Sequence, residues 1–235
     1  MEPSYIFSDR AEAGRALVPL LRDHAGRAGV IVLGVGRGGL RVAHEVASGL
    51  DAPLDLLSVG RIRMPGHDYI TIGGVTTDGA CVLDKSRIAA GQLSNEQVAG
   101  ARADAERALV AREARFRAGR PPIEVFGRVA VLVDDGMASG STMRLACALV
   151  RTRRPHVVIV ASPVASEDAC NALAGLADAV VHLATPVPIG NVALWYQDFA
   201  TPDDGTVRAM LHGMLPSTVP QRRSAGSFPR VAAAS

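Results

Sequence analysis

The feature that most constrains this chain is an apolar run that ends in two acids and continues into a loop of glycine and hydroxyl residues. Residues 129–133 are too short and too β-branched for a helix, so they predict a buried strand. Asp134 and Asp135 follow, then a loop over 136–142 and a helix pattern over about 143–151. Backbone N–H groups of such a loop, with the positive end of a helix behind them, form a cradle for an anion.

The two acids add a different binding capacity to the same loop. Carboxylates cannot hold a phosphate, but Asp134 and Asp135 suit sugar hydroxyls and a hydrated Mg²⁺, a hard cation that takes oxygen ligands. A phosphate site beside a diol or metal site fits a phosphorylated sugar. The plainer alternative is an ordinary strand-to-helix turn with polar capping residues, because short motifs also occur by chance.

The segment resembles the signature of the type I phosphoribosyltransferases, whose donor is 5-phosphoribosyl 1-diphosphate (PRPP). The resemblance implies that Asp134 and Asp135 hold the ribose hydroxyls and contribute to a Mg²⁺ site, directly or through water. It also implies that the following loop binds the 5-phosphate of the donor. The residues of this 5-phosphate loop are Gly136, Met137, Ala138, Ser139, Gly140, Ser141 and Thr142.

A second glycine-rich loop spells G-x-G-x-x-G over residues 34–39, after one predicted strand and before a helix. Alone, this pattern also fits a dinucleotide-binding turn, with Asp51 or Asp55 as the ribose-binding acid. In the transferase family an Arg-Gly-Gly turn at this place binds the diphosphate of PRPP. The resemblance therefore implies a diphosphate loop in which Arg37 stabilises the leaving group. This loop comprises Gly36, Arg37, Gly38 and Gly39.

The resemblance covers about residues 5–212 and points to a bacterial subgroup with an inserted long helix. It implies Mg²⁺-dependent transfer of phosphoribose to an acceptor, expected to be a nitrogen heterocycle, with release of diphosphate. Ala138 stands where 6-oxopurine transferases carry an acid, which disfavours hypoxanthine and guanine. Trp195 and Tyr196 are candidates for a hood that stacks on the acceptor, or for a staple that holds the C-terminal segment to the core.

Two other function classes stay open at this stage. One is a regulator that senses PRPP or a nucleotide without turnover, and the other is a nucleotide phosphorylase or hydrolase on the same fold. The resemblance identifies the donor far better than the acceptor, and it assigns no acid–base residue. His67 and Asp68 are candidates for that role, in a polar stretch at 61–68 that is expected to be a flexible loop.

Composition agrees with a single enzyme domain. A chain of 235 residues with 48% apolar and 20% charged residues can bury one core. The net charge of +2 disfavours nucleic acid as a partner, and the absence of a long apolar run predicts neither export nor a membrane span. Three scattered cysteines form no evident disulfide framework, so a cytoplasmic location is expected. A homodimer is left open.

Strands alternating with helices predict an α/β fold, a parallel sheet with helices on both faces, as in the type I phosphoribosyltransferases. The first helix is expected over 9–27, with Leu20 among its core-facing residues. One domain is expected over 1–215. It should include a helical insertion at about 85–122, which begins with a capping box of Ser94 and Gln97, and a hood segment at about 185–212. A mobile tail is expected over 216–235.

Overall fold

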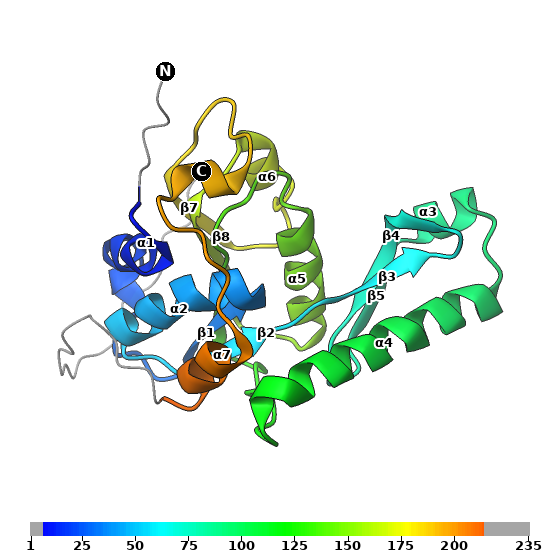
Figure 1. Ribbon diagram of the computed structural model, residues 1–235, viewed down its shortest axis with the longest axis horizontal. Helices are drawn as coiled ribbons and strands as arrows, with labels where there is room; N and C mark the ends of the chain where they lie inside the picture. The colour runs from blue at the N-terminus through cyan, green and yellow to red at the C-terminus, as the bar shows by residue number, and fades with distance from the viewer. Residues whose placement is uncertain (1–6, 214–235) are drawn as a thin grey trace.

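The computed structural model describes residues 7–213, so the expected tail at 216–235 lies outside the described residues (Figure 1). Its centre is a five-stranded parallel sheet in the order β2-β1-β6-β7-β8. The predicted α/β class is thereby confirmed. The middle strands are buried on both faces, which explains why they read as continuous apolar runs. The strands are β1 (Val30–Val35), β2 (Leu54–Leu57), β6 (Val129–Val133), β7 (Val157–Val164) and β8 (Ala179–Ala184).

Helices cover both faces of this sheet, as predicted (Figure 1). On one face, α1 (Arg10–Leu17) and α2 (Gly36–Leu50) pack Leu17, Val42 and Val46 against the strands. On the other face, α5 (Ser141–Thr152) and α6 (Glu167–Asn171) bury Met143, Cys147 and Ala169. The last described helix, α7 (Asp204–Leu211), packs beside α2 and the end of α4 (Asn95–Arg117).

The first helix is shorter than the sequence suggested. It ends at Leu17, and a 3-10 helix η1 (Val18–His24) continues from it with Pro19 in its first turn. The tighter winding changes which side chains face the core, so Leu20 is 50% exposed while Leu21 is buried. The expectation that Leu20 faces the core was wrong because it assumed one uninterrupted α-helical period.

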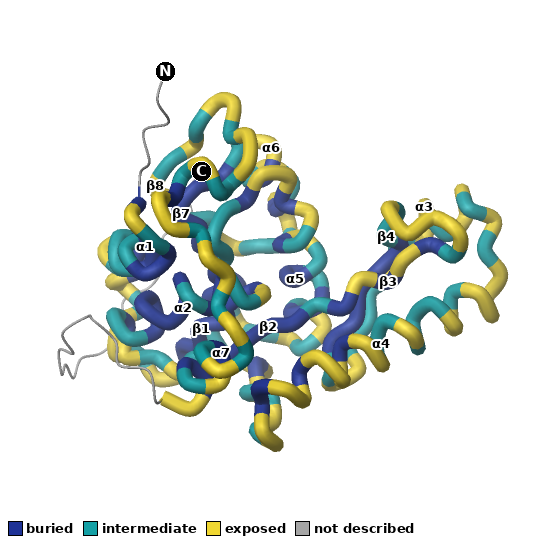
Figure 2. The backbone as a smooth tube through the Cα atoms, viewed as in Figure 1, coloured by how far each residue is buried: buried dark blue, intermediate teal, exposed yellow. Residues whose placement is uncertain are grey.

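Residues 60–117 form an arm that extends from the body of the molecule (Figure 1). It consists of the antiparallel strands β3 (Gly60–Met64), β4 (His67–Val75) and β5 (Cys81–Leu83) with α3 (Lys85–Ala90) and α4 (Asn95–Arg117). Figure 2 shows buried stretches of these strands lying along α4, whose outer side is exposed. Ile62, Ile72 and Leu109 are among the residues buried between them. The capping box of Ser94 and Gln97 at the start of α4 is confirmed.

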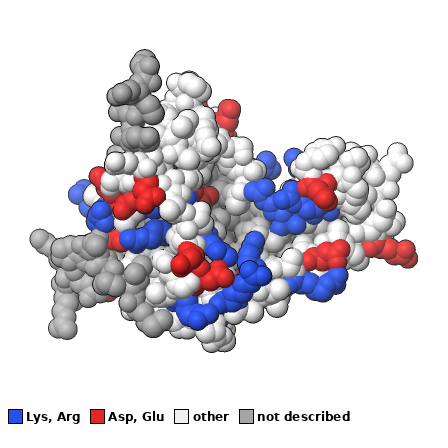
Figure 3. All heavy atoms as spheres, in the orientation of Figure 1, with Lys and Arg blue, Asp and Glu red and all other residues white. Residues whose placement is uncertain are grey.

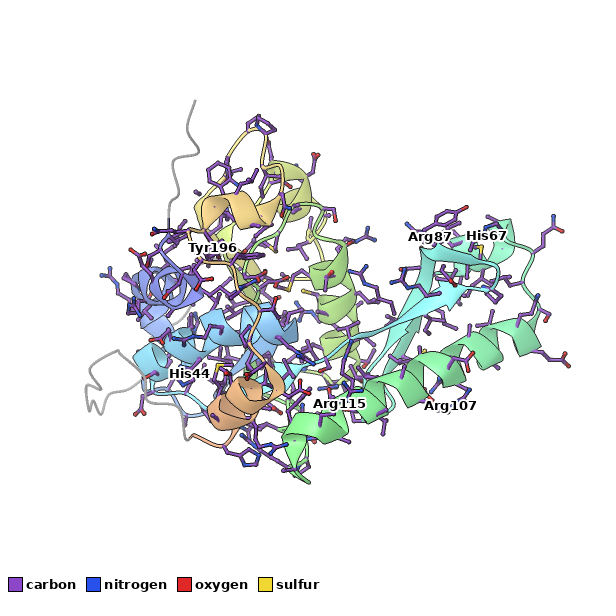
Figure 4. The ribbon with its side chains drawn as sticks, viewed as in Figure 1. His44, His67, Arg87, Arg107, Arg115 and Tyr196 are labelled. Atoms are coloured by element: carbon purple, nitrogen blue, oxygen red, sulfur yellow. The ribbon has the colours of Figure 1, made fainter. Side chains whose placement is uncertain are left out.

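The stretch at 61–68, expected to be a flexible loop, instead belongs to the β3–β4 hairpin. Within it Ile62 and Met64 are buried, whereas Arg61 and Arg63 are exposed. That alternation is the period of a half-buried strand, and the density of polar residues concealed it. His67 begins β4 and Asp68 follows it. Figure 4 shows His67 on the arm, away from the body of the molecule.

A buried ionic cluster joins the arm to the body. Arg117 at the end of α4 pairs with Asp55 of β2 at 3.0 Å and with Glu113 one turn earlier. It also donates to the Leu56 carbonyl at 2.8 Å. Removing one partner of such a pair leaves a buried charge uncompensated. The cluster therefore holds the end of α4 against β2.

Candidate active site

The two glycine-rich loops meet at the acid pair. Asp134 and Asp135 lie at the carboxyl end of β6, the central strand, where ligands of open parallel sheets bind. A Cβ atom on Gly38 would lie 2.1 Å from the Asp135 Oδ2 atom, and one on Gly39 would lie 2.6 Å from the Val133 carbonyl oxygen. Only glycine permits this close approach. The loop at 36–39 and the acid pair therefore lie side by side, although they are nearly a hundred residues apart in the chain.

The predicted diphosphate loop is the first turn of α2. Gly36 has a left-handed φ of +69°, and no side chain caps the helix at Val35. The first N–H groups of a helix have no partner within it, so this turn presents free donors at the positive end of the helix dipole. Arg37 projects from the turn and pairs with Asp204 of α7 at 2.7 Å, with both side chains about one-third exposed.

The predicted 5-phosphate loop leads into α5 with a similar geometry. Gly140 precedes the helix with a left-handed φ of +65°, and the Ser139 hydroxyl donates to the Ser141 hydroxyl at 3.1 Å. Met137 is buried, and its backbone N–H donates to the Val164 carbonyl at 2.9 Å, so it anchors the loop. A cavity of about 140 Å³ lies in this loop, bounded by residues 136–143, Asp134 and Val192.

Asp134 occupies an unfavourable place for a carboxylate without a ligand. Its Oδ1 atom accepts the backbone N–H of Asp135 at 2.9 Å. Burial, and then the neighbouring Asp135 carboxylate, raise the pKa of Asp134 well above its usual range. A sugar hydroxyl or a cation at this carboxylate would offset that penalty, so the geometry favours a ligand there.

Asp135 is engaged within the protein. The Arg10 guanidinium contacts its Oδ2 atom through Nε at 2.7 Å and through Nη2 at 2.6 Å. Arg10 also donates to the Ala200 carbonyl at 2.9 Å and stacks on the Phe199 ring, 3.6 Å from its centroid. No role for Arg10 was predicted from the sequence; its place directly after the capping residue Asp9 of the first helix was the signal that could have pointed to it.

The two predicted hood residues lie in different surroundings. Tyr196 is only 2% exposed, packs on Phe7 and Phe199, and donates its hydroxyl to the Asp135 carbonyl at 2.5 Å (Figure 4). Its ring has no free face for an acceptor, so its assignment to the hood is corrected to that of a staple. A buried tyrosine needs a partner for its hydroxyl, and the strand end supplies one. Trp195 is partly exposed and donates from Nε1 to the Ile189 carbonyl at 2.8 Å.

Two further residues reach the site without having been predicted. Val192 lines the cavity of the predicted 5-phosphate loop, and its side chain occupies the space beside Gly136. Arg61 reaches from the arm and donates to the Thr142 hydroxyl. Arg61 was not assigned to the site because its segment was interpreted as a polar loop.

The side chains present suit a metal that arrives with its substrate better than one held by the protein alone. Among residues 7–213 no group of three His, Cys, Asp or Glu side chains could hold a metal ion. Asp135 already neutralises Arg10, which leaves Asp134 as the carboxylate with spare capacity. Mg²⁺ keeps most of its own waters or takes substrate oxygens, so one carboxylate is sufficient for such a complex.

Comparison with known proteins identifies the family. The chain matches the phosphoribosyl transferase domain over residues 9–181, and it belongs to that family. Two curated proteins from Mycobacterium tuberculosis strains CDC 1551 and H37Rv, each named "Putative phosphoribosyl transferase", are 38% identical to it over 206 residues. The alignment covers 88% of this chain but 46% of each relative, so the chain spans about half their length.

A solved structure supports the fold. The crystal structure of TT1426 from Thermus thermophilus is 35% identical, with a TM-score of 0.77 over 89% of this chain and 99% of that chain. Within the described range, no helix is both long enough and apolar enough to cross a bilayer.

Proposed function

We propose that this protein binds PRPP as a complex with Mg²⁺ and transfers its phosphoribosyl group to a nitrogen heterocycle. The observation that carries the proposal is the contact of Gly38 and Gly39 with the acid pair. The N-terminus of α2 and the 139–142 loop therefore both border Asp134. One ligand with a diphosphate, a ribose and a 5-phosphate has the groups to occupy all three positions.

The chemistry of this donor requires two tasks from the chain, and bound magnesium would supply a third. As the bond between C1 and the diphosphate oxygen breaks, negative charge collects on the leaving group, where the first-turn N–H groups of α2 and Arg37 stabilise it. Positive charge develops on the ribose ring, and the Asp134 carboxylate favours it. Magnesium, when bound, neutralises the diphosphate and orients it.

Arg37 would have to exchange its partner during this reaction. In this structure its guanidinium pairs with Asp204, which lies on α7 outside the acid pair. The diphosphate offers more negative charge and a bidentate geometry that guanidinium prefers. Arg37 would therefore leave Asp204 when PRPP binds.

The test is diphosphate release by the purified protein with PRPP, Mg²⁺ and single heterocycles, including adenine, uracil, hypoxanthine and guanine. Release that depends on one heterocycle, well above the rate without it, is the expected result. Gly100→Ala, at a position with no neighbour within 4 Å of the added Cβ, serves as a control that should keep full activity. Tight PRPP binding without release for any heterocycle would instead favour the non-catalytic sensor.

A further inference from the structure

A large groove separates the arm from the body of the molecule. Its volume is about 780 Å³, within the range of small-molecule sites. One wall is the arm, through β4, β5 and α3, and the other is the exposed side of α5. Ser141, Arg144, Leu145 and Ala148 line that second wall at the spacing of one helix face.

The groove begins at the 5-phosphate loop. Ser141 lines both this groove and the 140 Å³ cavity of the loop. Arg61, which also lines the groove, donates to the Thr142 hydroxyl beside it. An anion seated in the loop therefore has the groove directly next to it.

Basic side chains dominate the charge of the groove. Arg61, Lys85, Arg87 and Arg144 line it, against the single acid Asp84. Asp84 caps α3 and pairs with Arg87 at 3.3 Å. Within residues 7–213 neither Lys85 nor Arg144 has an ion-pair partner, and both are exposed. Figure 3 shows basic atoms gathered on the arm near the body, and Figure 4 places Arg87 on the arm. Unpaired cations in a cavity favour an anionic occupant.

The position of the groove argues against the acceptor as its occupant. None of its lining residues belongs to the acid pair, to the 36–39 loop or to the segment at 185–200. A nucleophile that attacks C1 of the ribose must lie near those elements, because they hold the reacting end of the donor. The groove instead lies at the opposite end, where the 5-phosphate ends a PRPP molecule.

We propose that this groove binds the β- and γ-phosphates of nucleoside 5′-di- and triphosphates whose α-phosphate occupies the 139–142 loop. This inference rests on the proposed function, since it uses the same loop as a phosphate site. Lys85 and Arg144 supply the charge for the terminal phosphates, with Arg61 at the junction. Such nucleotides exclude PRPP, so the protein responds to the level of nucleoside triphosphate.

Competition binding tests the proposal with AMP, ADP, ATP, GMP and GTP against PRPP at fixed Mg²⁺ concentration. The expected result is at least tenfold tighter binding of ATP than of AMP, with a similar ratio for GTP over GMP, because the groove contacts no base. In the Lys85→Ala/Arg144→Ala variant the ratio should fall to about one, while the PRPP Kd changes less than twofold. The charge-matched control Arg102→Ala/Arg107→Ala, on the outer part of α4, should keep the ratio.

The outcomes separate this inference from the proposed function. Equal affinities for AMP and ATP, or a triphosphate advantage that survives in the double variant, overturn the groove assignment while PRPP binding stands. Failure of the wild-type protein to bind PRPP overturns the proposed function. In that case direct calorimetric titration of AMP and ATP replaces the competition, and a triphosphate advantage that disappears in the double variant would still support the groove.

Discussion

Arg10 contacts a single oxygen of Asp135 through two of its nitrogens, Nε at 2.7 Å and Nη2 at 2.6 Å, and both side chains are largely buried. The same guanidinium stacks on Phe199 and bonds to the Ala200 carbonyl. One side chain of the first helix therefore joins the acid pair to the C-terminal segment. The arrangement ties Asp135 to the first helix, whereas no guanidinium pairs with Asp134 among the described residues.

Replacing Arg10 by Met should destabilise the protein by about 3 kcal/mol, because a largely buried carboxylate loses the guanidinium that neutralises it. Chemical denaturation measures this change. Arg10→Met combined with Asp135→Asn removes both charges and should recover much of the loss. If the double variant is as unstable as Arg10→Met alone, the stacking on Phe199 matters more than the ion pair.

Replacing Asp134 by Asn should stabilise the ligand-free protein at neutral pH. The fold raises the pKa of Asp134 above its ordinary value of 3.8. The folded protein therefore loses stability relative to the unfolded chain as the pH rises above about 3.8, because Asp134 ionises more easily in the unfolded chain. Asn keeps the acceptor for the Asp135 N–H and cannot ionise. The difference in unfolding free energy between Asp134→Asn and the wild-type protein, measured between pH 4 and 8, should grow with pH. A difference that does not vary with pH would contradict the raised pKa of Asp134.

Replacing Asp204 by Asn should tighten PRPP binding by up to about fivefold. The Arg37–Asp204 pair is partly exposed, and such pairs contribute about 0–1 kcal/mol. Its removal frees the guanidinium and takes a negative charge from the neighbourhood of the diphosphate. Asp104→Asn, on the exposed side of α4, is the control. Weaker PRPP binding in Asp204→Asn would mean that Asp204 positions Arg37 for the ligand.

Replacing Gly38 by Ala should abolish PRPP binding, because the new methyl group would lie 2.1 Å from the Asp135 carboxylate oxygen. That contact must displace either Asp135 or the first turn of α2. Gly100→Ala on α4 has open space around the new methyl and should leave binding unchanged. Retention of normal affinity by Gly38→Ala would show that the diphosphate loop is not where PRPP binds.

The central sheet and its loops could be predicted because local patterns determine them. The run at 129–133 is apolar throughout, and a strand of that kind in an α/β chain is buried on both faces. Gly36 and Gly140 have left-handed φ values directly before helices. The hydrophobic patterns locate those helices to within a few residues. Both loops were predicted to follow strands, but no local pattern indicates that Gly38 approaches Asp135.

The remaining features depend on contacts between distant segments. Arg10 meets Asp135 across 125 positions, and Tyr196 meets it across 61. The periodicity of apolar residues along a chain does not indicate which distant residues come into contact. The hairpin at 60–75 shows a different limit, since exposed Arg61 and Arg63 led to the interpretation of most of β3 and the start of β4 as a loop. The choice between hood and staple stayed open for Tyr196 because an aromatic pair gives no sign of which ring faces the core.

Calorimetric titration of PRPP in the presence of Mg²⁺ tests the central claim most directly. We predict saturable binding to the wild-type protein and at least a tenfold loss, about 1.4 kcal/mol, in Asp134→Asn/Asp135→Asn. Binding should also fall when Mg²⁺ is chelated. An unchanged Kd in the double variant, with the protein still folded, would contradict the assignment of the acid pair to the ribose of PRPP.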